Sequence, residues 1–266
     1  MARGLSPAPQ GFAGAVLADI DWAQPWFAPW RELGEPTACQ ALQHQSVAEA
    51  LNALQAKTQG DLNEVKFVPQ ASLPEGQAYE DFIFNTQQVP TRDGLHDFFN
   101  GLCWHRFPKA KRRLNQLQAA EIAKFGVSQT RGPVRDALTL FDENVVLMHA
   151  PDDVWAALQA RDWLKLFVDL RAQWQQVNVV LFGHALLEKL ITPYKSITGH
   201  VYRVASEVNP YDEVALDDWL VQDLQPAKLA TKPYEPLPVL GVPGWWAANN
   251  GRAFYEDTQV FRPKRS

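Results

Sequence analysis

The segment from Leu95 to Phe125 constrains the fold most, because it has a helical apolar pattern that is interrupted only once, at Pro108. Proline suits the first position of a helix and glycine suits the residue after its end, and Gly126 follows the segment. The pattern therefore predicts two consecutive helices, over 95–106 and 108–125. At 100° per residue, the apolar side chains of the first helix fall on one arc of about 140°: Leu95, Phe98, Phe99, Leu102 and Cys103.

Shorter apolar runs lie on both sides of this helix pair. Runs with helical spacing predict further helices over 37–57, 78–84, 151–173 and 216–224. Alternating or continuous apolar runs predict short strands at 65–68 and in "ITGHVYRVA", and "RDALTLFDENVVLMHA" predicts a β-hairpin at about 137–149. "VNVVLFGHALLEKL" indicates a buried strand, a glycine turn and a helix that begins near His184. We expect an α+β fold, a single mostly helical domain with the β-hairpin and a small mixed sheet.

Composition divides the chain into three parts and limits its class. Residues 1–36 predict an N-terminal arm pinned to the body by Trp22, Trp26 and Trp30, 37–225 the main α+β domain, and 226–266 a Pro/Trp-rich tail packed on the body. The net charge of −5 gives no overall attraction to nucleic acid or anionic lipid, and two cysteines make no disulfide framework. No apolar run approaches the roughly 18 residues of a membrane span. We expect a cytoplasmic protein with no membrane partner.

His96 and Asn100 are the first candidates for a catalytic role. They are four residues apart at the edge of the apolar arc, where the rim of a core meets solvent. A boundary histidine satisfied by a backbone carbonyl remains the alternative. The His96-Asp97 dipeptide also occurs in metal-dependent phosphohydrolases, but two letters recur by chance and that fold is all-helical.

A basic turn opens the second predicted helix. It contains Lys109, Lys111, Arg112 and Arg113, at the helix end whose dipole favours acidic residues. Residues 92–136 carry nine basic and four acidic side chains, within an acidic chain. Either an anionic ligand or acidic partner offsets this charge, with Arg92 as a further contact, or the turn is a solvated face that pairs with acids elsewhere.

His184 and Glu188 are candidate ligands of a divalent metal. They lie one helical turn apart, so both side chains can reach one ion such as zinc, manganese or iron. The adjacent His96 and Asp97 diverge by about 100° on a helix and cannot easily do so. A helix-stabilising His-Glu contact is the alternative.

Three further sets of residues have weaker signals. Arg135 and Asp136 precede the predicted hairpin and either line a cleft or pair with each other. Asp142 and Glu143 occupy the predicted turn, where such residues are favoured for geometry alone. The loop around Trp245 is a candidate lid over a pocket, or a structural clamp.

Several long strings in the chain are similar to a known family. "VPTRDGLHDFFNGLCWHRFPKAKRRLNQLQ", "RDALTLFDEN", "LFGHALLEKL", "LPVLGVPGWW" and "FYEDTQVFR" resemble a family of uncharacterised bacterial proteins, the domain-of-unknown-function family 3025. The resemblance covers roughly residues 22–262 and implies no established activity. It marks these residues as motif positions: Arg92, His96, Asp97, Asn100, Arg135, Asp136, Asp142, Glu143, His184 and Glu188.

Two classes of function follow from these residues. The first is a metal-assisted hydrolase of an anionic, phosphate-bearing substrate, with His96, Asn100, Arg135 and His184 gathered in one cleft and the basic turn at its rim. The second is a non-catalytic module that binds an acidic partner, or less favourably nucleic acid, through the basic turn.

Overall fold

The computed structural model describes residues 14–57, 65–126 and 132–264. The predicted α+β class and helical majority are confirmed. The α-helices in chain order are α1 (Gly14–Ala18), α2 (Arg31–His44), α3 (Val47–Lys57), α4 (Tyr79–Thr86), α5 (Leu95–Arg106), α6 (Pro108–Phe125), α7 (Pro133–Asn144), α8 (Asp152–Ala160), α9 (His184–Lys189), α10 (Glu213–Asp223) and α11 (Pro226–Ala230).

The strands form two small sheets. β1 (Lys66–Pro69) and β2 (Gln88–Thr91) pair in parallel. The other sheet is mixed, as predicted, with the order β4-β3-β5-β6. Its central strand β3 is antiparallel to β4 and parallel to β5, and β5 is antiparallel to β6. Its strands are β3 (Val145–His149), β4 (Asn178–Leu181), β5 (Thr198–Arg203) and β6 (Glu235–Pro238).

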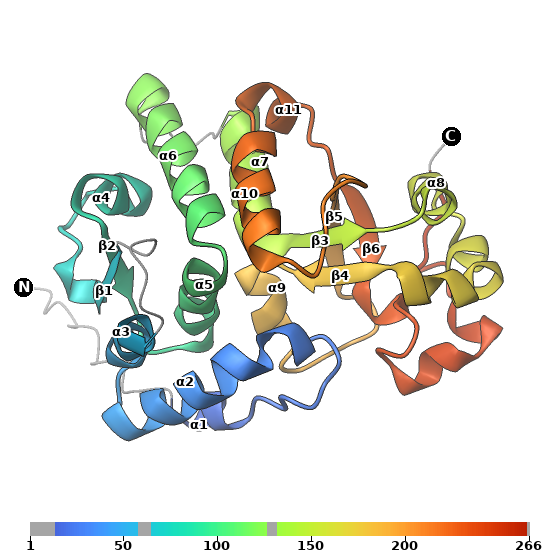
Figure 1. Ribbon diagram of the computed structural model, residues 1–266, viewed down its shortest axis with the longest axis horizontal. Coiled ribbons are helices and arrows are strands. Elements are labelled where there is room, and N and C mark those ends of the chain that lie inside the picture. The colour runs from blue at the N-terminus through green and yellow to red at the C-terminus, as the bar shows by residue number, and fades with distance from the viewer. Residues whose placement is uncertain (1–13, 58–64, 127–131, 265–266) are drawn as a thin grey trace, which may run out of the picture.

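Most helices of the first half of the chain lie on one side of the molecule, and the mixed sheet lies on the other (Figure 1). Helices α2 to α6 and the β1-β2 pair form one side, and the mixed sheet with α8 and the C-terminal segment forms the other. Helices α7, α9 and α10 lie between them. One hydrophobic cluster runs through both sides, from Leu17 to Phe261, so the described residues share a single core.

The prediction of a strand in the first half of the β-hairpin is wrong. Residues 137–144 belong to helix α7, and only the second half, 145–149, is a strand. Pro133 occupies the first turn of α7 and Asp136 favours the same end of its dipole. Its buried residues are Ala137, Leu138 and Phe141, which lie on one helical face. The alternation of apolar and polar residues in 137–144 fits a strand as well as a helix. The helix start signals, Pro133 and Asp136, are what distinguish the two.

Two predicted helices are shorter than expected. The 37–57 run is divided into α2 and α3 at Gln45, which adopts a left-handed φ of 53°. The 151–173 run ends as an α-helix at Ala160, since Arg161 is left-handed at φ 53°. A π-helical turn at 165–169 and a 3₁₀ segment at 171–176 follow it.

The predicted N-terminal arm is partly helical, because α1 lies within it and α2 begins at Arg31. Trp22, Trp26 and Trp30 are all buried in the common core. The indole Nε1 of Trp30 donates to the carbonyl of Leu181 over 3.2 Å, which ties this segment to the end of β4. The division of the chain at residues 36 and 225 stays a prediction.

None of the helices within 14–57, 65–126 and 132–264 is both long enough and apolar enough to cross a bilayer.

Candidate functional site

Helix α5 provides the frame of the site. Every residue from Asp97 to Trp104 is buried, so neighbours surround the helix instead of covering only the predicted arc. Helices α3, α6 and α9 all contact it. His96 lies at its N-terminal end, where 38% of the side chain remains exposed. The helix therefore holds a partly exposed imidazole at the edge of a rigid core.

The turn at Gly183 presses α9 onto the end of α7. The amides of Phe182 and Gly183 both donate to the carbonyl of Val145, over 3.0 and 2.9 Å. A Cβ at Gly183 would lie 2.5 Å from the backbone nitrogen of Asn144, so only glycine permits this approach. The turn brings His184 and Glu188 of α9 against His96 of α5.

His96 bonds to both residues of α9. Its Nδ1 lies 2.9 Å from Oε2 of Glu188, and its Nε2 lies 3.1 Å from Nε2 of His184. The two imidazole planes are nearly perpendicular, at 83°. One ring nitrogen of His96 therefore faces a carboxylate and the other faces a buried imidazole.

The surroundings give the two histidines different charges. The hydrogen bond with Glu188 raises the pKa of His96. Burial lowers the pKa of His184 to about 4, so this ring is neutral at ordinary pH. Two facing nitrogens need one donor and one acceptor. A protonated His96 that donates to Glu188 and to His184 meets this requirement, and the remaining His184 proton is then on Nδ1.

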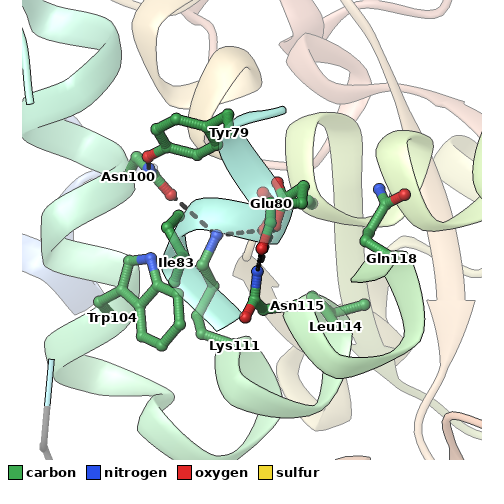
Figure 2. Close-up of a pocket in the computed structure, with 10 residues that line it drawn as sticks. Tyr79, Glu80, Ile83, Asn100, Trp104, Lys111, Leu114, Asn115 and Gln118 are labelled. Atoms are coloured by element: carbon green, nitrogen blue, oxygen red, sulfur yellow. Dashed lines mark hydrogen bonds and ion pairs between the residues drawn. The ribbon is translucent and has the colours of Figure 1, made fainter. Parts of the chain in front are cut away.

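Asp142 of α7 continues the network into the core. Its Oδ2 lies 3.7 Å from Nδ1 of His184, and its Oδ1 accepts from the ammonium of Lys111. Burial opposes ionisation of Asp142, but the charge of Lys111 outweighs it, and the pKa of the carboxyl is lowered. Lys111 is 4% exposed and also donates to Oδ1 of Asn100 over 2.8 Å. Figure 2 shows its side chain reaching toward Asn100.

A small polar cavity lies behind Lys111, between α4, α5, α6 and α7. Its polar walls include Tyr79, Glu80, Asn115 and Asp142, and about 20 Å³ of it is open to a water-sized sphere. This volume has room for about one water molecule. The Tyr79 hydroxyl accepts from Asn100 over 3.2 Å, and Glu80 accepts from Asn115 over 2.7 Å. Burial, followed by the nearby Asp142, raises the pKa of Glu80.

Polar groups thus run from the surface to the cavity. Glu188, with 39% of its side chain exposed, and His96 form the outer end, whereas His184, Asp142 and Lys111 form the buried part. Such an arrangement fixes the orientation of the His96 ring and favours its protonated form.

The structure brings together five of the predicted site residues: His96, Asn100, Lys111, His184 and Glu188. Arg135 lies near enough to Glu80 to oppose the rise of its pKa. Asp136 is separate from them and faces Lys232 over 3.9 Å. The ring of Trp245 packs on Trp26, with centroids 6.3 Å apart, which suits the clamp better than the lid.

Arg92 lies at the outer end of the site. Its Nε and one terminal nitrogen each donate to Asp97 over 2.9 Å, and this bond raises the pKa of the guanidinium. The Arg92 side chain is 57% exposed. It lies close enough to His96 for its charge to oppose the rise of the imidazole pKa.

The basic turn finds its acidic partner inside the molecule. Asp217 of α10 accepts from the backbone amides of Lys109 and Ala110, over 3.0 and 2.8 Å. The neighbouring Asp218 pairs with the ammonium of Lys109. Arg113 donates to the carbonyl of Leu224, and Arg112 also has a partner. The charge that suggested an external anion is therefore offset within the molecule, by acids in the middle of α10 and by Asp142 of α7.

The predicted metal pair has a different arrangement from the one expected. His184 and Glu188 bond to opposite nitrogens of the His96 ring, so one ion could join them only if that ring moved away. Within the described parts of the chain, no group of three or more His, Cys, Asp or Glu side chains has the arrangement of a metal site. Cys103, expected in the core, is buried there, and burial raises its pKa to about 12.

Four participants were not among the predicted site residues: Tyr79, Glu80, Asn115 and Asp142. Asp142 was assigned to a hairpin turn, although the family resemblance had marked it. A helical assignment of 133–144 would have placed it one turn beyond Leu138, on the buried side. Tyr79, Glu80 and Asn115 lie on ordinary amphipathic helices, and nothing in their local pattern distinguishes them.

The comparisons with known proteins give one result. No curated protein and no solved structure matches the chain. The family model described as "Protein of unknown function (DUF3025)" matches residues 65–265, three quarters of the chain, and this stretch contains every residue of the polar network. The chain therefore belongs to the DUF3025 family of proteins of unknown function.

Proposed function

We propose that this protein is a hydrolase that acts on an anionic substrate and uses His96 as its general acid and base. The observation that carries this proposal is the position of His96, hydrogen-bonded to Glu188 at one nitrogen and to His184 at the other, with 38% of its side chain exposed. Both ring nitrogens of His96 are engaged, so a proton can pass to a bound molecule only when one of these two hydrogen bonds opens, and the partial exposure of the ring gives a substrate access to it.

The neighbours of His96 suit this role. Glu188 fixes the ring and raises the pKa of His96, so the protonated imidazole is available to a leaving group near neutral pH. His184, kept neutral by burial, accepts the second hydrogen bond of the protonated His96. Without its proton, His96 can accept one from an attacking water.

The expected charge of the substrate follows from Arg92. Its guanidinium is 57% exposed and lies beside His96, although Asp97 occupies two of its donors. One terminal nitrogen remains available for an anionic oxygen. The cavity behind Lys111 has room for only about one water molecule. A larger substrate must therefore meet the site from the exposed edge of His96.

The proposal is tested by assaying purified protein with p-nitrophenyl phosphate, bis(p-nitrophenyl) phosphate and p-nitrophenyl acetate. We expect turnover of at least one anionic ester, and a loss of about 10²–10⁴-fold in kcat/KM in His96→Asn. His44→Asn is the matched control, because His44 also faces a glutamate, Glu49, at 3.8 Å on an exposed surface.

Turnover that is equal in His96→Asn and the wild type would overturn the role of His96. If none of the three esters is hydrolysed, the protein is not a hydrolase of these ester classes. The alternative of a module that binds an acidic partner predicts unchanged behaviour in His96→Asn. Its basic turn, however, is already engaged by α10.

A further inference from the structure

A second, larger pocket lies at one end of the mixed sheet. It forms where the end of α8, the start of β5, the end of β6 and the C-terminal segment meet. About 410 Å³ of it is open to a water-sized sphere, within the usual range for small-molecule sites. The polar residues of its wall are Arg161, Ser196, Thr198, Gln259 and Arg262, and the apolar ones are Trp163, Pro236, Pro238 and Val260.

The wall carries two positive charges and no acidic side chain. Neither Arg161 nor Arg262 forms an ion pair with any residue in 14–57, 65–126 or 132–264. The Nε of Arg161 is buried and has no hydrogen-bond partner there. Buried donors are nearly always satisfied, so an orphan on a pocket wall points to a missing acceptor.

The backbone segments that carry the two arginines are held by a rigid surround. The indole Nε1 of Trp163 donates to the carbonyl of Arg262 over 2.8 Å, which fixes the C-terminal segment against α8. Trp163 is stacked on Phe167 with an interplanar angle of 10° and meets Phe261 edge-on. Arg161 is held at the left-handed C-cap of α8, where its amide bonds back to the helix.

The nearest acid in the sequence is directed elsewhere. Asp162 follows Arg161, but its carboxylate accepts from the amide of Lys165 over 3.1 Å and does not line the pocket. Lys264 adds a third cation nearby, since its ammonium donates to the carbonyl of Gln159 near the end of α8. The lining of the pocket is therefore positive in a protein of net charge −5.

We propose that this pocket binds a small phosphate monoester whose phosphate is carried on a flat apolar group. A dianionic phosphate matches two guanidinium groups in charge, whereas a carboxylate matches one. The hydroxyls of Ser196 and Thr198 can donate to the remaining oxygens. Trp163, Pro236 and Pro238 give the flat group an apolar wall. The site shares no lining residue with the His96 network.

Calorimetric titration with phenylphosphonate at mildly alkaline pH tests the site, because this dianion cannot be hydrolysed at a phosphate ester bond. We expect one ligand per chain, and binding weakened about tenfold or more in Arg161→Gln and in Arg262→Gln. Arg161→Lys should recover only part of the affinity, because an ammonium lacks the planar fork. Arg31→Gln, which removes an exposed arginine of α2 that does not line the pocket, should bind like the wild type.

Inorganic phosphate and benzoate separate the contributions of the two halves of the ligand. Each should bind more weakly than phenylphosphonate, since one lacks the ring and the other lacks a charge. Arg262→Gln alters an exposed residue, so it decides the outcome if Arg161→Gln does not fold.

The proposal is overturned if the wild type shows no saturable binding, if both arginine variants bind like the wild type, or if benzoate binds as tightly as phenylphosphonate. His96→Asn should leave this affinity unchanged. Loss of binding in that variant would place the ligand at the His96 site instead. Failure of the hydrolase assay, by contrast, leaves this titration unaffected, so the two proposals are tested separately.

Discussion

At the residue scale, the charge of His96 depends on one neighbour at each ring nitrogen. Glu188 favours the protonated form through a hydrogen bond of 2.9 Å, and the neutral His184 accepts at the other nitrogen. The same contacts would stabilise the packing of α5 on α9 even without catalysis. Removal of each neighbour in turn distinguishes the protonation state from simple packing.

Glu188→Gln should lower the pKa of His96 toward its ordinary value near 6.5, because the largest cause of the raised pKa is the hydrogen bond to this carboxylate. The measurement is the pH titration of the His96 ring signal by NMR. Any pH-dependent limb of hydrolysis that belongs to His96 should move to lower pH with it. Glu49→Gln is the control, and an unchanged His96 titration in Glu188→Gln would contradict the assignment.

The buried pair of Lys111 and Asp142 predicts strong coupling. Lys111→Met should cost about 3–5 kcal/mol of unfolding free energy, because it leaves Asp142 largely buried without its main counter-charge. The double variant Lys111→Met with Asp142→Leu should cost clearly less than the sum of the two single changes. Urea denaturation of the four proteins checks this. Additive losses would mean that the two charges do not interact.

At the element scale, α10 caps α6 through a side chain from outside the helix. Phe107, at the N-cap position of α6, provides no side-chain hydrogen bond, and Asp217 takes this role from α10. Asp217→Ala should therefore lower the unfolding free energy by about 1–2 kcal/mol, the usual cost of a lost cap. Asp218→Ala, which removes a more exposed acid from the same turn, is the matched control.

Asp217 also predicts a specific dependence on pH. Burial raises its pKa from 3.8 to about 6, so the folded state holds the proton more tightly than the unfolded state. Its contribution to stability is thus complete below about pH 4 and is lost as the pH rises through about 6. Asp217→Asn cannot ionise, so its stability relative to the wild type should increase by up to about 3 kcal/mol across this window. Urea denaturation at several pH values checks this, and a constant difference would contradict the raised pKa.

The elements that the sequence predicts well are those with strong boundary signals. Pro108 and Gly126 delimit α6, and Gly183 precedes α9, so the predicted bounds agree with the structure. Residues 137–144 lack such a contrast, because a short alternating run fits both a strand and one face of a helix. The Pro133 start signal lies four residues before that run, outside the segment that the pattern addressed.

The meeting of His96 and His184 follows from a general expectation that polar residues at the edges of apolar runs converge on one site. Their separation of 3.1 Å agrees with it, while their roles stay predictions. The separate contacts of His184 and Glu188, one at each nitrogen of the His96 ring, did not follow from the sequence. Helical spacing puts His184 and Glu188 on one face, but it cannot show that a ring from α5 lies between them.

At the scale of the whole molecule, one core joins segments from both ends of the chain. Trp30 is fully buried, its indole bonds to the end of β4, and the guanidinium of Arg106 lies 4.9 Å from its ring. Trp30→Ala should lower the unfolding free energy by about 3–5 kcal/mol, as for other buried aromatics. Trp30→Phe should cost less, since it loses the hydrogen bond and keeps most of the packing.

Unfolding of Trp30→Ala should remain a single transition, seen alike by circular dichroism and by fluorescence, because the described residues share one cluster. Two separate transitions, with the sheet melting apart from the helices, would contradict a common core.

The hydrogen bond between Trp30 and Leu181 also means that one of its two partners is synthesised well before the other. The two residues are 151 positions apart, and a ribosome releases the N-terminal one first. Until β4 has left the exit tunnel, the indole and the aromatic residues beside it have no sheet to cover. A nascent chain of this protein therefore lacks the contact between Trp30 and the sheet for about 7–30 seconds at ordinary elongation rates. We expect chaperones that hold unfinished chains to bind this segment during that time.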